Sequence, residues 1–417
     1  MTNSLDQWVQ KIQAQHPADI ELGLDRVIKV ANKLNLIKHN PKQQLVLIGG
    51  TNGKGTTASI LEALSVNSGK SVFCYSSPHI LKFNERIRLN GNCIDDKSLI
   101  RSFEIIDKAR AEIKLTFFEF TTLAAMQIES EFKVDIAIYE MGLGGRLDAV
   151  NILQPNVSMI TSIGLDHTDW LGESLQQIAA EKVAIARPGK PLIIADDDIE
   201  DYAYEAARKY TDSLFSLGTD FFVTADTNES SVKVEFNDIK ITMDLPQSVH
   251  PKNFAGACFA ASKIGFDLQH QSTQTSLKNA LNQLFLPGRF ETVGEAPEII
   301  LDVSHNQQAL ENLQPKIKRL KGPIKLVCGM LSDKLNHAVL ETLCGYGYDW
   351  YLVSLKVPRG AKTRDLKQQL NQEQTQHHDN FKQAMNSALA DAKGCGSIVV
   401  FGSFHMVEAA KRFFKEN

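Results

Sequence analysis

Residues 43–57 read QQLVLIGGTNGKGTT, and the fold follows from this stretch. The apolar run 45–48 predicts a buried parallel strand, which breaks at a pair of glycines. A second pair of glycines brackets Lys54, and a helical pattern follows over residues 57–64. Glycines let backbone N–H groups turn toward an anion, a helix N-terminus adds partial positive charge, and the lysine adds a full charge. The stretch therefore predicts a phosphate-binding loop and a chain that binds ATP or a similar nucleotide.

The loop departs from the usual P-loop spacing. The common pattern has glycine six residues before the lysine and Ser or Thr directly after it. Here those positions hold Ile48 and Gly55, and the hydroxyl comes one residue later, at Thr56. The alternative is a glycine-rich turn without a ligand, but such a turn needs no lysine between two glycines at the start of a helix.

The composition is that of an ordinary globular protein. The chain has 417 residues, of which 43% are hydrophobic and 23% charged, and this length suggests two or three domains. The net charge is −4, and no lysine- and arginine-rich tract of the kind that binds nucleic acid occurs. We expect no nucleic-acid partner, so local positive groups must hold an anionic ligand.

The sequence also bears on the compartment. The N-terminal segment is polar and amphipathic and lacks the basic-then-apolar layout of a secretory signal. No apolar run approaches the length of a membrane span. The six cysteines are scattered without a CxxC pair, which favours reduced thiols over a disulfide frame or a zinc site. We therefore expect a cytoplasmic protein without membrane contact.

Strand-like runs alternate with helix-like runs along the chain. After the glycine loop, aliphatic and β-branched runs without polar alternation occur at 71–77, 134–140, 156–164 and 190–196. Such runs predict strands that are buried on both faces, and helical patterns lie between them. We expect an α/β fold whose first domain is a P-loop domain with a doubly wound, mainly parallel sheet.

Two domains are expected. Residues 221–246 alternate polar and apolar side chains around turn signals, which predicts a small antiparallel insertion. Residues 284–291, LFLPGRFE, predict a hinge, and the α/β rhythm restarts beyond them. The domains are thus expected to be 1–287 and a smaller parallel-sheet domain, 288–417. The polar stretch 368–380 predicts a solvated surface segment.

Polar side chains follow successive strands, where ligands collect in open parallel sheets. A nucleotide triphosphate needs Mg²⁺, which prefers oxygen ligands, and Glu140 stands where P-loop proteins place an acidic metal residue. Ser77 and Thr56 can add hydroxyl oxygens. His167 is a less typical ligand, and on chemistry alone a helix-capping or core histidine explains it equally well.

Two further features of the first domain are ambiguous. Lys182 lies on a helical run, 174–189, and its spacing alone favours a solvated helix lysine. The segment GLGGRLD, 142–148, lacks the last glycine of a dinucleotide fingerprint because Leu147 stands there. Its glycines instead favour a close approach of backbone to a ligand.

In the second domain, polar residues again stand at strand ends. These are Asp302, His305 and Ser403, while Arg289 in the hinge can meet a phosphate with its planar guanidinium. Loop capping explains each of them as well as a functional role does.

Ten segments occur in an order that carries a resemblance: GTNGKGTT, YSSPH, FNERIRLNG, LTFFEFTTLAA, EMGLGGRLDAVN, TSIGLDHTDWLG, EKVAIARPGKP, LPGRFE, LDVSHN and GSFHMV. Together they resemble the folylpolyglutamate synthase/dihydrofolate synthase family, within the Mur-type ATP-dependent amide ligases. The resemblance covers about residues 20–410. It implies a P-loop α/β domain joined to a smaller Rossmann-like α/β domain, with the active site between them.

The resemblance also implies roles by position. ATP would be held by Gly50, Thr51, Asn52, Gly53, Lys54, Gly55, Thr56, Asn253, Arg289 and Asp302. One or two Mg²⁺ ions would be ligated by Ser77, Glu140 and His167. The pterin-side pocket would comprise Leu22, Gly23, Leu24, Asp25, Thr116, Phe117, Phe118, Glu119, Leu147, Asp148 and Ala149. Catalytic roles would fall to Lys54, His167, Lys182, Asp302, His305 and Ser403, with the last two linked to the incoming glutamate. Lys182 matches a lysine that can be carbamylated, and a monovalent cation can accompany Mg²⁺ in such a site.

The implied activity is the ATP-dependent addition of L-glutamate to dihydropteroate, which forms dihydrofolate, and to tetrahydrofolate and folylpolyglutamates, through an acyl phosphate. The segment LTFFEF is similar to that of bifunctional bacterial enzymes, which favours both activities over folylpolyglutamate synthase alone. The pterin-pocket segments speak against a ligase of cell-wall peptides. The lack of an NKxD motif speaks against a GTPase switch or a non-catalytic nucleotide-binding module. We expect a monomer that acts on small molecules.

Overall fold

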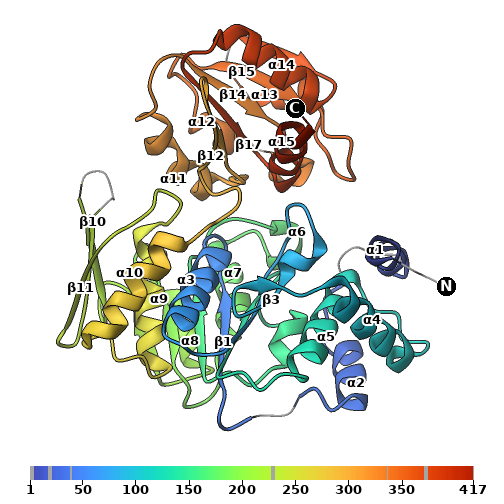
Figure 1. The fold of residues 1–417 in the computed structure, drawn as a ribbon, viewed down its shortest axis with the longest axis vertical. Coiled ribbons are helices and arrows are strands. Elements are labelled where there is room, and N and C mark those ends of the chain that lie inside the picture. Colours follow the sequence, from blue (N-terminus) through green and yellow to red (C-terminus); the bar gives the residue numbers. More distant parts are fainter. Residues whose placement is uncertain are drawn as a thin grey trace. The chain divides into compact units, whose positions relative to one another are not determined.

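The structure, a computed structural model, describes residues 4–16, 21–37, 40–226, 231–335, 337–370 and 374–416. It comprises two compact units (Figure 1). The first contains Met1–Ile163 and Leu171–Leu284, and the second contains Gly164–Trp170 and Phe285–Asn417. The domain limits expected from the sequence, 1–287 and 288–417, stay a prediction, and the segment 164–170 is a grouping that the sequence did not indicate.

The first unit alternates strands and helices along the chain. Its elements are α1 (Leu5–Ala14), α2 (Asp25–Lys33), β1 (Gln44–Gly49), α3 (Lys54–Asn67), β2 (Val72–Tyr75), η1 (Phe83–Arg86), β3 (Ile87–Leu89), β4 (Asn92–Cys93), α4 (Asp96–Arg110), α5 (Phe117–Glu129), β5 (Ile136–Glu140), η2 (Ala149–Ile152), β6 (Val157–Ile160), α7 (Leu175–Val183), β7 (Leu192–Ile194), α8 (Asp201–Arg208), β8 (Leu214–Ser216), β9 (Phe222–Ala225), β10 (Ser231–Phe236), β11 (Ile239–Asp244), α9 (Pro251–Lys263) and α10 (Gln271–Gln283). The short helix α6 (Thr168–Leu171) crosses the limit between the units.

An eight-stranded sheet forms the centre of the first unit, in the order β4-β3-β2-β5-β1-β6-β7-β8. Six neighbouring strands, β2, β5, β1, β6, β7 and β8, run parallel to one another. At the β2 edge, β3 pairs antiparallel with β2, and β4 pairs antiparallel with β3. In the register of β1, Ile48 lies beside Glu140 of β5, and Gly49 lies beside Ile160 of β6. The loops that follow these three strands therefore leave the sheet side by side.

Helices cover both faces of this sheet, as its apolar strands require. On one face, alternate strand residues such as Leu47 and Tyr139 pack in a core with α1, α2, α4, α5, α7 and α8. The other face contacts α3 and α9, and α10 packs on α3 (Figure 1). This is the mainly parallel, doubly wound α/β fold expected from the sequence, which is thus confirmed.

A separate three-stranded antiparallel sheet, in the order β11-β10-β9, occupies the chain between β8 and α9. In β10, Val232, Val234 and Phe236 are buried and alternate with partly exposed side chains. Such a period of two is typical of a sheet with one covered face.

The second unit repeats the α/β rhythm around a six-stranded sheet, in the order β12-β13-β17-β14-β15-β16. All neighbouring strands are parallel except β12, which pairs antiparallel with β13. Its elements are β12 (Glu291–Glu295), β13 (Glu298–Leu301), α11 (Gln307–Ile317), β14 (Ile324–Cys328), η3 (Ser332–Lys334), α12 (His337–Glu341), β15 (Asp349–Val353), α13 (Thr363–Gln369), β16 (Thr375–His378), α14 (Phe381–Ala392), β17 (Ser397–Phe401) and α15 (Phe404–Glu416).

The described residues 374–380 are exposed or partly exposed, as expected for a solvated surface segment, but part of the stretch 368–380 is a strand. Residues 375–378 form β16, which pairs only with β15 at the edge of the sheet. Side chains on an edge strand face water, so a polar sequence is compatible with a strand there. Residues 371–373 lie outside the described residues.

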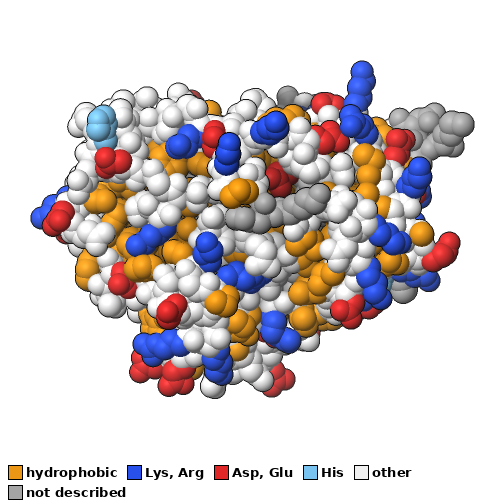
Figure 2. All heavy atoms as spheres, turned by 90° about the horizontal axis from the view of Figure 1, so that it is seen from below, with side chains coloured by type: hydrophobic (Ala, Val, Ile, Leu, Met, Phe, Trp, Pro, Cys, Tyr) orange, Lys and Arg blue, Asp and Glu red, His pale blue; other side chains and the backbone are white. Residues whose placement is uncertain are grey.

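None of the helices in the described ranges is both long and apolar enough to cross a lipid bilayer. Figure 2 shows one face of the molecule, on which basic and acidic side chains are interspersed among apolar and neutral ones. This mixture agrees with the small net charge of −4.

Candidate active site

At two positions in the loop between β1 and α3, the backbone has a conformation that only glycine adopts easily. Gly50 has φ 138° and Gly53 has φ 86°, both in the region that L side chains avoid. A Cβ atom on Gly50 would lie 2.0 Å from Thr161 Oγ1, and one on Gly53 would lie 2.3 Å from Asn253 Oδ1. The glycines are therefore needed both for the turn and for the close approach of its neighbours.

Lys54 is the first residue of α3, and its side chain folds back over the loop. Its Nζ donates hydrogen bonds to the carbonyl oxygens of Gly50, at 2.9 Å, and Thr51, at 3.2 Å. The ammonium group thus lies over the loop at the positive end of a 14-residue helix. This arrangement suits a phosphate group, whose charge the lysine and the helix N-terminus would both offset.

Two hydroxyl residues after β6 hold the loop, and the sequence analysis did not single them out. The carbonyl oxygen of Ser162 accepts a hydrogen bond from Thr51 N–H at 2.8 Å. The hydroxyl of Ser162 accepts one from Asn52 N–H at 2.9 Å. The hydroxyl of Thr161 donates to the carbonyl oxygen of Asn52 at 2.6 Å. The signal was present, because polar residues directly after a strand adjacent to the loop strand share its edge of the sheet.

A buried carboxylate, that of Glu140, lies at the end of β5 beside Ser77 and the start of α3. Glu140 is 4% exposed, and its Oε2 accepts a hydrogen bond from the N–H of Ser77 at 3.2 Å. A Cβ on Gly55 would lie 3.5 Å from the same oxygen, so the helix start passes close to the carboxylate. The hydroxyl residue Thr56 is buried on this turn. A buried carboxylate beside hydroxyl groups fits Mg²⁺, which prefers such ligands.

Asp148 organises the loop that follows β5. One of its oxygens accepts hydrogen bonds from the N–H groups of Gly142 and Leu143, both at 2.8 Å, and the other from Val150 at 2.9 Å. Burial raises the pKa of Asp148 to about 6, although these backbone bonds and the charge of Lys54 act to lower it. The GLGG segment is thus folded around a buried carboxyl group.

The predicted pterin-side residues group around the start of α5. Thr116 and Glu119 form a capping box, and Arg26 Nε donates to Glu119 Oε1 at 3.2 Å, which ties α2 to α5. A Cβ on Gly142 would lie 2.5 Å from the ring of Phe118, so the ring packs on the loop that Asp148 holds. The remaining predicted residues lie before and at the start of α2, on α5 and around η2: Leu22, Gly23, Leu24, Asp25, Phe117, Leu147 and Ala149.

The spacing-based interpretation of Lys182 as a solvated lysine is wrong. Lys182 is 4% exposed near the end of α7. A Cβ on Gly145 would lie 2.8 Å from the carbonyl oxygen of Lys182, so the GLGG loop passes over this end of the helix. Periodicity could not reveal this, because the covering loop comes from elsewhere in the chain.

A second group of acidic residues, Asp196, Asp197 and Asp198, follows β7. Lys252 Nζ pairs with all three and lies 2.8 Å from Asp198 Oδ2. Ile163 N–H donates to Asp196 at 3.2 Å. The lysine offsets the acidic charge, and the group links the start of α9 to the loop after β6.

In the second unit, Asp302 holds the turn that carries Arg289. Its Oδ2 accepts a hydrogen bond from Phe290 N–H at 2.8 Å, and its Oδ1 accepts bonds from the N–H and hydroxyl of Ser304 at 2.8 and 2.5 Å. The guanidinium of Arg289 lies 5.4 Å from the centre of the Phe404 ring. The two predicted nucleotide residues of this unit are therefore near each other.

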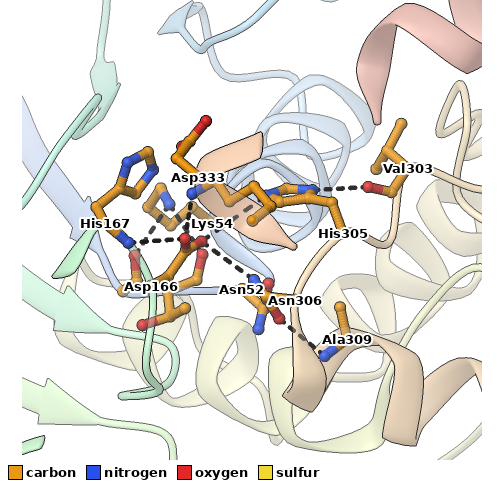
Figure 3. A network of polar contacts seen from close by, with 12 residues as sticks. Asn52, Lys54, Asp166, His167, Val303, His305, Asn306, Ala309 and Asp333 are labelled. Atoms are coloured by element: carbon orange, nitrogen blue, oxygen red, sulfur yellow. Dashed lines mark hydrogen bonds and ion pairs between the residues drawn. The ribbon is translucent and has the colours of Figure 1, made fainter. Parts of the chain in front are cut away.

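Asp166 is the centre of a polar network in the second unit (Figure 3). It accepts a hydrogen bond from Asn306 Nδ2 at 3.1 Å and pairs with Lys334, and His305 Nε2 lies 3.7 Å away. Burial would raise the pKa of Asp166, but the hydrogen bond of His305 and the charges of His167, His305 and Lys334 outweigh it and lower the pKa. The carboxylate thus fixes the segment Gly164–Trp170 against the residues after β13.

The other predicted residues of this unit have defined surroundings. His305 Nδ1 lies 2.8 Å from the carbonyl oxygen of Val303. The hydroxyl of Ser403 donates to the carbonyl of Gly329 at 3.1 Å and accepts from Met406 N–H at 3.2 Å, so it caps α15. Ser77 and Glu140 are adjacent in the first unit, whereas His167 belongs to the segment grouped with the second. Its role as a metal ligand stays a prediction.

Comparisons with known proteins decide the family. Residues 48–261 match the Mur ligase middle domain, and residues 288–404 match the Mur ligase, glutamate ligase domain. The dihydrofolate synthase/folylpolyglutamate synthase of Escherichia coli (strain K12) is 36% identical over 407 residues, 97% of this chain and 94% of that protein. The chain belongs to the dihydrofolate synthase/folylpolyglutamate synthase family of Mur ligases. The family expected from the ordered motifs is thereby confirmed.

Two solved structures of this family resemble the whole chain. One is E. coli FolC in complex with DHPP and ADP, with a TM-score of 0.92, 34% identity, and coverage of 99% of this chain and 98% of that one. The other is the Yersinia pestis bifunctional folylpolyglutamate synthase/dihydrofolate synthase complexed with AMPPNP and Mn ion, with a TM-score of 0.90, 35% identity, and coverage of 99% and 98%. Both match through both units of the fold.

Proposed function

We propose that this chain is an ATP-dependent ligase that adds L-glutamate to dihydropteroate, forming dihydrofolate, and to tetrahydrofolate and folylpolyglutamates. The observation that carries the proposal is the near full-length similarity to the bifunctional E. coli enzyme, at 36% identity over 97% of the chain. The glycine loop with Lys54, beside a buried Glu140, supplies the chemistry that such a ligase needs.

Joining a carboxylate to an amine in water is uphill, and a carboxylate is a poor electrophile. The substrate carboxylate therefore attacks the γ-phosphorus of ATP, and ADP leaves. The acyl phosphate has phosphate as its leaving group, and the amine of glutamate attacks the acyl carbon to form the amide. Catalysis of both steps depends mainly on positioning and on offsetting charge.

The chain's own residues bind the phosphates. The N–H groups in the first turn of α3, those of Lys54, Gly55 and Thr56, are assigned to the phosphates, and the ammonium of Lys54 offsets charge where it lies over the loop. Asn253, Arg289 and Asp302 are assigned to the rest of the nucleotide. His305 and Ser403 are assigned to the incoming glutamate, and the residues around α2, α5 and η2 to the pterin.

The donor set at the end of β5 fits a divalent cation. Ser77, Glu140 and His167 would hold one or two Mg²⁺ ions, and the Mn and AMPPNP bound by the Yersinia pestis enzyme support ATP and a divalent ion here. When bound, the cation offsets the charge of the triphosphate and of the carboxylate. A monovalent cation is a further part of the proposal, and its test is the dependence of turnover on added K⁺.

Carbamylation of Lys182 is part of the proposal. The neutral amine would attack CO₂ and lose a proton, which turns a cation into a carboxylate. Burial to 4% exposure favours the neutral amine that this reaction needs. A crystal structure of the protein in bicarbonate buffer tests it, and density for a plain ammonium group would count against the modification.

Folylpolyglutamate synthase activity alone is the alternative. The E. coli relative and the Yersinia pestis structure reported above carry both activities in their names, which favours the bifunctional assignment. Phosphate release from ATP is measured with glutamate plus dihydropteroate, plus tetrahydrofolate, or plus neither. Release with both folates and none without them supports the proposal; release with tetrahydrofolate alone establishes the alternative.

The remaining assignments are a cytoplasmic monomer without nucleic-acid or membrane partners. The net charge of −4 and the lack of a lysine- and arginine-rich tract support the absence of a nucleic-acid partner. Light scattering of the purified protein measures the molar mass, which for a monomer is 46.3 kDa.

A further inference from the structure

The turn that carries Arg289 has an unusual backbone. Gly288 has φ 65° and Phe290 has φ 48°, although a bulky side chain rarely adopts a positive φ. Phe290 is 8% exposed and packs in the core of the second unit. Such a conformation persists only where the surroundings impose it, and it often occurs where a side chain must be presented in one direction.

Two acidic residues impose this conformation from opposite ends of the turn. Asp302 accepts the hydrogen bond of Phe290 N–H, as described above. Glu291 Oε2 accepts a hydrogen bond from Gly288 N–H at 2.7 Å, and its Oε1 pairs with Lys411 Nζ on α15. The side chains of Lys411 and Glu291 are only 14% and 10% exposed, so this is a nearly buried ion pair.

The same helix supports the arginine itself. Phe404, the first residue of α15, lies under the guanidinium of Arg289, at 5.4 Å. Lys411 follows Phe404 by two helical turns and therefore lies on the same face of α15. One face of the helix thus contacts both the head of Arg289 and the turn that carries it.

Stability alone gives little reason for this pair. Two charges removed from water pay a desolvation cost, and apolar side chains of similar volume are often as stabilising. Fixing a geometry is a better reason to keep a charged pair under the turn. Neither Glu291 nor Lys411 is among the residues proposed to bind ATP, metal or substrate.

We propose that Glu291 and Lys411 are positioning residues for Arg289. Their ion pair holds residues 288–291 so that the guanidinium is presented to the nucleotide in one orientation. The inference rests on the proposed nucleotide role of Arg289, and it adds a function for the C-terminal helix α15.

The test is a double-mutant cycle on nucleotide affinity, measured by calorimetry with AMPPNP and Mg²⁺. Lys411→Met should weaken binding about 10-fold, or about 1.4 kcal/mol, and so should Arg289→Ala. The double variant should bind no worse than Arg289→Ala alone, because the pair acts through that side chain. Lys411→Arg should restore most of the affinity. In the Lys411 variants, the KM for glutamate should stay within about twofold of the wild-type value. Arg412→Met, on the exposed side of the same helix, is the control and should bind normally.

Additive losses, or unchanged affinity in Lys411→Met, would overturn the inference. If Lys411→Met does not fold, Glu291→Gln decides by the same criteria, because it keeps an acceptor for Gly288 N–H and removes the charge. Normal affinity in Arg289→Ala would also overturn it. Wild-type protein that binds AMPPNP but forms no dihydrofolate would instead contradict the proposed function, and the cycle would still be interpretable.

Discussion

At the scale of single residues, Lys54 is the group on which phosphate binding is expected to depend most. Its ammonium donates hydrogen bonds to the carbonyl oxygens of Gly50 and Thr51, at 2.9 and 3.2 Å. Lys54 is also the first residue of α3. No other residue of the loop carries a full positive charge. The binding and transfer of a phosphoryl group should therefore fail first when this group is removed.

Lys54→Ala should lower kcat by about 100- to 1,000-fold, the usual cost of removing one preorganised donor to a developing charge. Steady-state phosphate release with dihydropteroate and glutamate measures it. Lys70→Ala, an exposed lysine just after α3, is the control. Turnover of Lys54→Ala within a few-fold of wild type would show that the loop lysine has no role in phosphate transfer.

Asp148 makes stability depend on pH. Burial raises its pKa from 3.8 to about 6, so the folded state binds more protons than the unfolded state between these values. The free energy of unfolding should therefore fall as the pH rises through that window, by something on the order of 3 kcal/mol from this group. Asp148→Asn cannot titrate, so the stability of wild type relative to this variant should decline from pH 4 to pH 6. Denaturant unfolding at several pH values measures it, and a difference that does not vary with pH would contradict the assignment.

At the scale of elements, the junction of β1 and α3 depends on glycine for two separate reasons. Gly53 needs a positive φ and also leaves room for Asn253. Gly69 has a similar φ of 72°, but a Cβ there would meet nothing within 4 Å. The two positions separate the cost of backbone strain from the cost of a steric clash.

Gly69→Ala should cost about 1 kcal/mol of stability and leave nucleotide binding intact. Gly53→Ala should cost more and should abolish AMPPNP binding, because its Cβ would displace Asn253 and the loop. Thermal unfolding and calorimetry measure the two effects. Equal behaviour of the two variants would mean that contact with Asn253 is unimportant.

The elements also show what the sequence could predict. β1, β5 and β6 were predictable because strands buried on both faces read as continuous apolar runs. β16 was missed because an edge strand can be polar, and its residues gave no apolar signal. The hydroxyls of Thr161 and Ser162 were overlooked because the predicted strand, 156–164, included them, whereas β6 ends at Ile160. The pair of Glu291 and Lys411 could not be found, since 120 positions separate them and only the fold brings them together.

At the scale of the whole molecule, both units match one family along nearly the full chain, and the ordered motifs identified that family from sequence. The sequence could not predict which polar side chains are buried. The helical pattern predicts a surface lysine at position 182, but Lys182 is buried, and the GLGG loop passes close to its backbone carbonyl. Such contacts depend on how distant segments pack and not on the local pattern.

Removal of divalent cations should abolish ligase activity of the whole enzyme. Ser77 and Glu140 are proposed to provide oxygen ligands, so Mg²⁺ or Mn²⁺ should restore activity after treatment with EDTA. The Glu140→Gln variant should need a higher Mg²⁺ concentration for the same rate. Full activity of the EDTA-treated enzyme without added metal would contradict the metal assignment.

The proposed reaction activates a pteroate carboxylate with ATP and joins it to glutamate. The most direct test supplies dihydropteroate labelled with ¹⁸O in its carboxylate, together with ATP, Mg²⁺ and L-glutamate, and analyses both products by mass spectrometry. The account predicts dihydrofolate and an equal amount of phosphate that carries one ¹⁸O atom from the carboxylate. Absence of dihydrofolate, or phosphate without the label, would contradict it.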